Sequence, residues 1–202
     1  MRTRLRCGLA AALCLGVALG PSAVATPKHR PVCNLIVDGA GDADIVTPQP
    51  ALDVVSGDIA SDSSNVTVVF RLDGRPGDPN PQAPGGTRYF FEFGAPGSGD
   101  PQYLSAAFNA AGLGTYRTGH VTKSYLDDPA NPAVRGSVAG NVVTISAPLS
   151  AFTRVKLAPS QKLTRLTIET FTETGTLFLG VDDAAGGTYT TGAPSCVVPG
   201  KG

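Results

Sequence analysis

Five aspartates in the first third of the chain form its densest group of oxygen ligands. They are Asp38, Asp42, Asp44, Asp53 and Asp58. Hard cations such as calcium prefer carboxylate and carbonyl oxygens, and two glycines within the group let the backbone turn its carbonyls inward. The spacing lacks the glycine and the terminal glutamate of an EF-hand loop. The group therefore predicts a calcium site of another kind, and the alternative is that these aspartates bond their own backbone in turns.

Two adjacent aspartates near the other end of the sequence, Asp182 and Asp183, are candidate additional ligands. They follow a segment with the alternating pattern of a β-strand. They join the predicted calcium site only if this last strand lies beside the N-terminal aspartates.

Four tyrosines are candidates for a ligand-stacking surface, because a tyrosine ring offers a flat apolar face with a polar tip. They are Tyr103, Tyr116, Tyr125 and Tyr189. The alternative for most of them is packing within the fold. The ligand itself is not identified by these residues.

Catalytic signatures are missing from the sequence. It contains neither a G-x-S-x-G elbow nor an H-E-x-x-H helix. Of its two histidines, His29 falls in a segment without pattern, which leaves His120 as the one candidate imidazole. Glu92, Glu169 and Glu173 lie in predicted strands, where a solvent-facing role is the default. We predict a protein that is not an enzyme; the alternative, catalysis by His120 or by Asp182 and Asp183, would require a deep pocket.

Residues 1–25 have the pattern of a cleavable signal peptide. Three arginines precede an apolar run at residues 9–19, and Ala23-Val24-Ala25 supplies the small residues that a signal peptidase needs. The apolar run is shorter than the roughly 20 residues that span a bilayer, and no later run approaches that length. We therefore expect secretion with cleavage near Ala25, and no membrane span.

The predicted mature chain has 177 residues and a net charge of −3, because three of the 16 basic residues and none of the 16 acidic residues leave with the signal. Its size is that of one domain. A mildly acidic protein lacks the basic face that gives a sequence-independent grip on phosphates, so nucleic acid is excluded as a partner.

Two of the four cysteines, Cys33 and Cys196, remain after cleavage. An even pair in an oxidising compartment predicts one disulfide, here joining the two ends of the domain. The alternative is two unpaired thiols.

Short alternating apolar segments, separated by clusters of Gly, Pro, Asp, Asn and Ser, indicate an all-β fold. Predicted strands cover residues 66–72, 89–93, 102–108, 163–173 and 176–181, and a hairpin pairs 136–138 with 142–147. Residues 109–119 are ambiguous, 127–132 are predicted as a loop, and 148–155 are long enough for one helical turn only. Eight to ten strands with this spacing of turns predict an antiparallel two-sheet β-sandwich, jelly-roll-like, over residues 33–196. Residues 26–32 and 197–202 are expected to be loose tails.

The order of motifs resembles the opening of DOMON-like sandwiches. Residues 38–43 read DGAGDA, residues 52–62 read LDVVSGDIASD, and residues 180–184 with Tyr189 fit the end of the same pattern. The group includes family 9 carbohydrate-binding modules and accessory domains of secreted bacterial hydrolases. The sugar-binding members clamp their ligand between tryptophans, and this chain has none. Haem-binding relatives use Met and His, whereas the predicted mature chain has no Met, so haem is not expected.

These observations together predict a secreted, non-catalytic binding domain for an extracellular glycan or cell-envelope component, with calcium as a structural ion. The alternative is a cell-surface structural or interaction protein, acting through an exposed sheet edge and needing no small ligand. The sequence does not predict the oligomeric state.

Overall fold

The computed structural model describes residues 33–43, 49–122, 131–175 and 177–202. The predicted signal peptide, the predicted tail at 26–32, most of the predicted loop at 127–132, and the candidates His29, Asp44 and Tyr125 lie outside these ranges. Among the described residues, no helix is long and apolar enough to cross a membrane.

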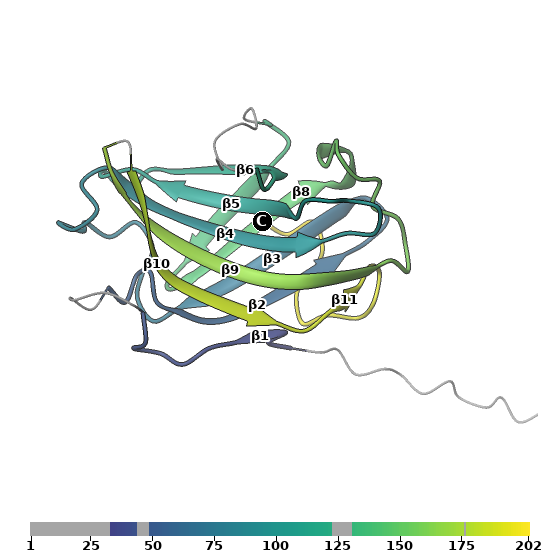
Figure 1. Cartoon of the computed structure of the whole chain (residues 1–202), viewed down its shortest axis with the longest axis horizontal. Helices are drawn as coiled ribbons and strands as arrows, with labels where there is room; N and C mark the ends of the chain where they lie inside the picture. Colours follow the sequence, from purple (N-terminus) through teal and green to yellow (C-terminus); the bar gives the residue numbers. More distant parts are fainter. Residues whose placement is uncertain (1–32, 44–48, 123–130, 176) are drawn as a thin grey trace, which may run out of the picture.

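Two antiparallel sheets pack face to face, which confirms the predicted β-sandwich (Figure 1). The five-stranded sheet has the order β1-β2-β3-β8-β7, with β1 at Ile36–Val37, β2 at Val54–Ser61, β3 at Asn65–Leu72, β8 at Val142–Pro148 and β7 at Arg135–Ala139. The six-stranded sheet has the order β10-β9-β4-β5-β6, with β10 at Leu177–Gly186, β9 at Lys162–Thr174, β4 at Gly86–Gly94, β5 at Gln102–Phe108 and β6 at Gly114–His120. A short strand β11, Tyr189–Thr190, pairs with the start of β9.

Alternation along each strand determines which side chains enter the core. In β3 the four alternate residues Val66, Val68, Phe70 and Leu72 are all fully buried, as the period-two pattern predicts. The facing strand β4 contributes its own aromatic row, and Phe70 stacks on Tyr89 with ring centroids 6.0 Å apart. The core therefore lies between the two sheets.

Most predicted strands are confirmed within one to three residues. The ambiguous stretch at 109–119 ends in β6, and the expected helical turn after Pro148 is a single 3₁₀ turn, Leu149–Ala151. β10 extends five residues beyond its predicted end at 181. The extension matters for function because it carries Asp182 and Asp183 on a strand rather than on the turn that follows.

The predicted disulfide between Cys33 and Cys196 is confirmed, with 5.3 Å between the two Cα atoms. It is consistent with an oxidising compartment. The last residues, which we expected to be loose, run along the outer face of the five-stranded sheet. There Val197 is buried against Ala60 and Val69, and the Gly200 amide donates a hydrogen bond to the Thr67 hydroxyl.

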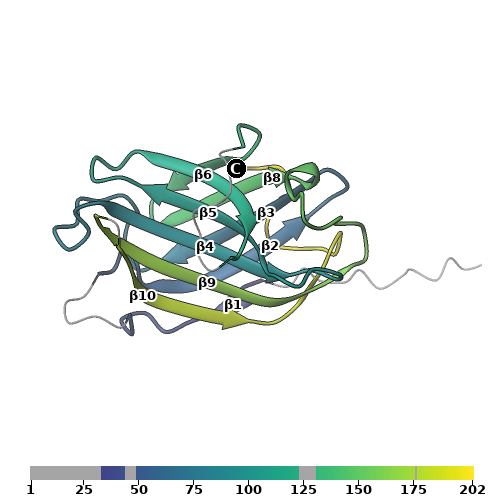
Figure 2. The ribbon, with the colours of Figure 1, turned by 45° about the horizontal axis from the view of Figure 1, so that its top comes forward.

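One edge of the sandwich brings the two ends of the domain together. The residues around β1 lie beside β10 in both views of the ribbon (Figures 1 and 2), and the Gly187 amide donates to the Leu35 carbonyl at 3.1 Å. The loop after β1, which carries Asp38 and Asp42, and the strand β10, which carries Asp182 and Asp183, therefore lie at the same edge.

Candidate metal centre

The loop that follows β1 presents two carboxylates to this edge. The Asp38 amide bonds the Val55 carbonyl at 3.0 Å, which holds the start of the loop against β2. Gly41 has φ of +89°, a left-handed conformation that glycine adopts without strain, and it reverses the chain so that Asp42 returns toward Asp38. The Gly41 amide donates a hydrogen bond to the Asp53 carboxylate at 2.6 Å, and this bond anchors the turn to the residue just before β2.

A β-bulge in β10 presents the third carboxylate. Gly180 pairs with Phe171 and Asp182 pairs with Thr170, so Val181 is an extra residue without a partner on β9. Val181 is buried in the core, and Asp182 also faces the inner side of the sheet. The Asp182 carboxylate accepts a hydrogen bond from the Val54 amide at 2.6 Å, which links β10 to the first residue of β2 in the other sheet.

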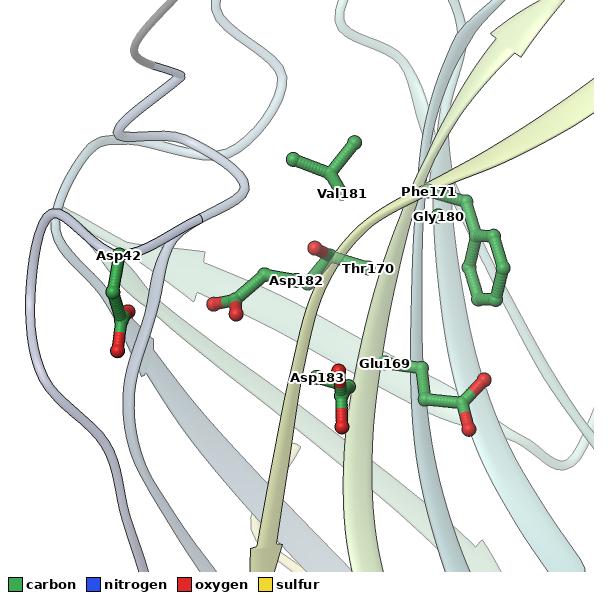
Figure 3. A pocket seen from close by; sticks show the side chains of 8 residues that line it. All are labelled: Asp42, Glu169, Thr170, Phe171, Gly180, Val181, Asp182 and Asp183. Atoms are coloured by element: carbon green, nitrogen blue, oxygen red, sulfur yellow. The ribbon is translucent and has the colours of Figure 1, made fainter. Parts of the chain in front are cut away.

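Asp38, Asp42 and Asp182 form a cluster in which one oxygen from each lies within 4.8 Å of the others. Figure 3 shows the Asp182 side chain pointing from β10 toward Asp42. Oxygens bound to one calcium ion at 2.3 to 2.6 Å are separated by at most about 5 Å, so the cluster has the dimensions of a calcium site. Among the described residues, this is the one such group of metal-ligating side chains.

Two buried carboxylate oxygens at this site have no hydrogen-bond donor among the residues that the structure describes. Asp53 is only 3% exposed, and its Oδ1 finds no hydrogen-bond donor among the described residues. Asp38 Oδ2 is also buried without a donor there. A buried carboxylate oxygen without a donor costs free energy, and a bound cation would satisfy it.

Burial, and to a lesser degree the neighbouring negative charges, shift the protonation of two aspartates here. Burial raises the pKa of Asp182 to about 6; the hydrogen bond from Val54 lowers it, and the charges of Asp38 and Asp42 raise it further. Burial likewise raises the pKa of Asp53, against the bond from Gly41, with smaller contributions from neighbouring aspartates. A divalent cation would stabilise the ionised form of both groups.

A pocket of about 490 Å³ opens beside the cluster (Figure 3). Asp42 and Asp182 line one part of it. The other part lies on the outer face of the six-stranded sheet, where the lining residues are Glu169, Phe171, Gly180 and Asp183. Glu169 lies on the outer face of the sheet, as the sequence predicted, and alternation along β9 places Phe171, to which the sequence assigned no role, on the same face.

Two predicted metal ligands lie apart from the cluster. Asp58 faces the outer side of the five-stranded sheet, where its buried carboxylate forms an ion pair with Arg71 at 3.0 Å and accepts the Leu35 amide. Asp183 is exposed on the opposite face of β10 from Asp182. Asp53, a third predicted ligand, is not one of the three clustered residues; its carboxylate accepts the Gly41 amide and so holds the loop in place.

The candidate tyrosines offer little stacking surface. Tyr103 is 2% exposed and Tyr189 4% exposed, and the Tyr189 hydroxyl accepts the Ser61 amide and donates to the Ala193 carbonyl. Tyr116 is half-buried against Gly136. Packing, the alternative use of these residues, therefore accounts for the three that the structure describes.

His120 lies at the end of β6 and lines a smaller pocket of about 220 Å³ with Gln102, Asn131, Phe152 and Arg154. The pocket is well below the volume of the one beside the acidic cluster. Asp182 and Asp183, the other catalytic alternative, point to opposite faces of β10 and do not act as a pair.

No protein-family model and no curated protein sequence matches this chain. The resemblance to DOMON-like sandwiches therefore stays a prediction from short motifs. Among solved structures, a proposed carbohydrate-binding protein from Bacteroides uniformis is similar over 74% of this chain and 75% of its own, at 11% identity and a TM-score of 0.38. A likeness at this level is too remote to bear on function.

Proposed function

We propose that this chain is a secreted, non-catalytic binding domain for an extracellular glycan, organised by a structural calcium ion. The observation that supports the proposal is the Asp38, Asp42 and Asp182 cluster, with buried oxygens that lack a donor among the described residues and an open pocket next to it. Asp38 does bond the backbone of its own turn, since its Oδ1 accepts the Gly39 amide at 2.9 Å, but Asp182 reaches this cluster from a strand in the other sheet.

The ion would fasten two segments to each other. Asp38 and Asp42 belong to the loop after β1, and Asp182 belongs to the edge strand β10. Asp53, just before β2, holds the same loop through the Gly41 amide. Without a cation, several carboxylates repel one another across this edge. Calcium would therefore set the position of the loop that forms one wall of the pocket.

The test of the ion is direct titration of the purified chain with calcium, and with terbium as a luminescent substitute. We expect one site in the wild type, loss of most of the affinity in Asp42→Asn, and retention in the matched control Asp183→Asn, which changes the exposed neighbour of Asp182. Wild-type protein without a calcium site, or equal affinities in the two variants, would contradict the proposal.

The test of glycan binding is sedimentation with insoluble polysaccharides and cell-wall material, in calcium and in chelator. Calcium-dependent sedimentation with one polymer is the expected result. Failure to sediment with any of them, with calcium bound, would refute the glycan half while leaving the ion in place.

A second candidate function is protein interaction through the exposed end of β10. Leu177 and Leu179 are 62% and 52% exposed, and β10 is the edge strand of its sheet. An unpaired edge with apolar side chains is a template for pairing with another chain. Cross-linking on intact cells should then recover an adduct with an envelope protein, and recovery of monomer alone would count against this function.

A further inference from the structure

Two of the three clustered carboxylates lie in the wall of the open pocket. Asp42 and Asp182 line this pocket of about 490 Å³, Asp42 is exposed, and the Asp182 side chain points toward it (Figure 3). Asp38 does not line the pocket, and its Oδ2 is buried. A cation held about 2.3 to 2.6 Å from oxygens of all three would therefore be shielded on the Asp38 side and reached from the pocket.

The cluster supplies fewer ligands than a calcium ion takes. Asp38 Oδ1 already accepts the amide of the next residue at 2.9 Å, and Asp182 Oδ2 accepts the Val54 amide at 2.6 Å. These bonds favour binding through one oxygen by each group, so that with both oxygens of Asp42 the cluster offers about four ligands. The buried Asp53 Oδ1, which has no donor among the described residues, is a candidate fifth. The pentagonal-bipyramidal arrangement common for calcium has about seven, so about two ligands must come from the pocket.

We propose that two adjacent hydroxyl groups of a glycan enter the pocket and coordinate the calcium ion directly. Hydroxyl oxygens are neutral hard ligands, like the waters that they would replace on the ion. The cavity of about 490 Å³ is within the range of small-ligand sites and accommodates a sugar ring. Recognition through the ion needs no aromatic platform, and this chain has no tryptophan.

The inference rests on the proposed function, because without the ion the hydroxyl pair has nothing to bind. It adds the chemical feature that the glycan must carry, which is two free hydroxyl groups on neighbouring carbons. A glycan site elsewhere on the surface would not require that pair, and it would not exchange waters on the ion. These two properties separate the inference from glycan binding in general.

The first measurement counts the waters on the ion. Terbium replaces calcium in the full chain, and its luminescence lifetimes in H2O and in D2O give the number of bound waters. We expect about two in the wild type, and a fall toward none when soluble galactomannan is added. Terbium bound without water ligands, or a water count that galactomannan does not change, would overturn the inference while leaving the ion site in place.

The second measurement compares polymers that differ in their hydroxyl pairs. Cellulose, xylan and β-1,4-mannan have free hydroxyls side by side at C2 and C3, whereas the linked C3 separates the free ring hydroxyls inside a β-1,3-glucan chain. In calcium, the protein should sediment with at least one β-1,4-linked polymer and stay in solution with β-1,3-glucan. Periodate cleaves the bond between adjacent hydroxyl-bearing carbons, so oxidation and borohydride reduction of the bound polymer should weaken sedimentation at least about tenfold. Equal binding to the oxidised polymer or to β-1,3-glucan, or no binding to any polymer, would overturn the inference.

Two variants place the sugar on the ion. Asp42→Asn should lose terbium and the polymer together. Asp183→Asn is the matched control, because Asp183 lines the same pocket but lies outside the cluster, and it should keep both. Polymer binding that survives in Asp42→Asn, or in wild type with chelator, would leave a glycan site and remove the ion from it. A wild type that holds no terbium at all refutes the proposed ion itself, and the inference fails with it.

Discussion

Replacing Asp182 with asparagine should change the stability of the domain in opposite directions with and without calcium. In the absence of calcium, the folded-state pKa of about 6 lies above the ordinary value of 3.8 for an aspartate. Ionising Asp182 near neutral pH therefore costs the folded state about 2 to 3 kcal/mol. Asparagine carries no charge, and its carbonyl oxygen can still accept the Val54 amide. We expect the variant to be more stable than the wild type in chelator, by about 5 to 10 °C in Tm.

The pH dependence follows from the same shift. A carboxyl group whose pKa is raised on folding contributes stability that is fully present below its unfolded pKa and lost as pH rises through the folded pKa. The calcium-free wild type should therefore lose stability from about pH 4 to about pH 7, and Asp182→Asn should lose less over that range. Asp53, whose pKa is also raised, acts in the same direction in both proteins.

Calcium should reverse the order of stability, so that the wild type becomes more stable than Asp182→Asn. An ion present at a thousand times its Kd stabilises the wild type by about 4 kcal/mol, which exceeds the cost of ionising Asp182, while the variant lacks one of the three ligands. Thermal unfolding of both proteins and of the control Asp183→Asn, in chelator and in millimolar calcium at neutral pH, measures each difference. If Asp182→Asn is destabilised equally in chelator and in calcium, the carboxylate is a favourable structural group in its own right and the argument from burial is refuted.

Three further predictions concern the frame that holds the site. The double variant Cys33→Ser, Cys196→Ser opens a loop spanning 163 residues and should lose up to about 5 kcal/mol in urea unfolding, with no difference from the wild type once both are reduced. Arg71→Ala leaves the buried Asp58 carboxylate without its ion pair and should cost about 3 kcal/mol, part of which Asp58→Asn should restore; additive losses would contradict the pairing. Gly57→Ala places a methyl group where a buried isoleucine of β9 lies and should cost about 1 to 3 kcal/mol; a neutral effect in the same assay would show that the two sheets can separate there.

The fold could be predicted from the sequence because strands and hairpins are specified by neighbouring residues, and because the one long-range link, the disulfide, has a single possible pairing. The alternation of Val66, Val68, Phe70 and Leu72 specifies a strand and its buried face without reference to any other segment. The hairpin of β7 and β8 needs only a short turn between two apolar runs. The disulfide follows from the count of cysteines left after the predicted cleavage, because two thiols allow a single pairing.

The membership of the acidic cluster could be predicted only in part, because proximity in sequence is a poor guide to proximity across a sandwich. Asp38 and Asp42 share one loop, so their grouping follows from spacing. Asp58, equally close in sequence, is carried to the outer face of the sheet by the alternation of β2, and there it meets Arg71. Asp182 joins from the other sheet, and its bond to the Val54 amide spans 128 residues of sequence.

The bulge in β10 explains why the alternation of that strand misleads. In a regular strand Asp182 would share the outer face with Gly180, and Asp183 would face inward. The extra residue Val181 shifts the phase by one position, so Asp182 turns toward Asp38 and Asp42 while Asp183 turns outward to face Glu169. The bulge thus decides which of the two adjacent aspartates reaches the acidic cluster, and regular alternation from Gly180 would have selected Asp183 instead of Asp182.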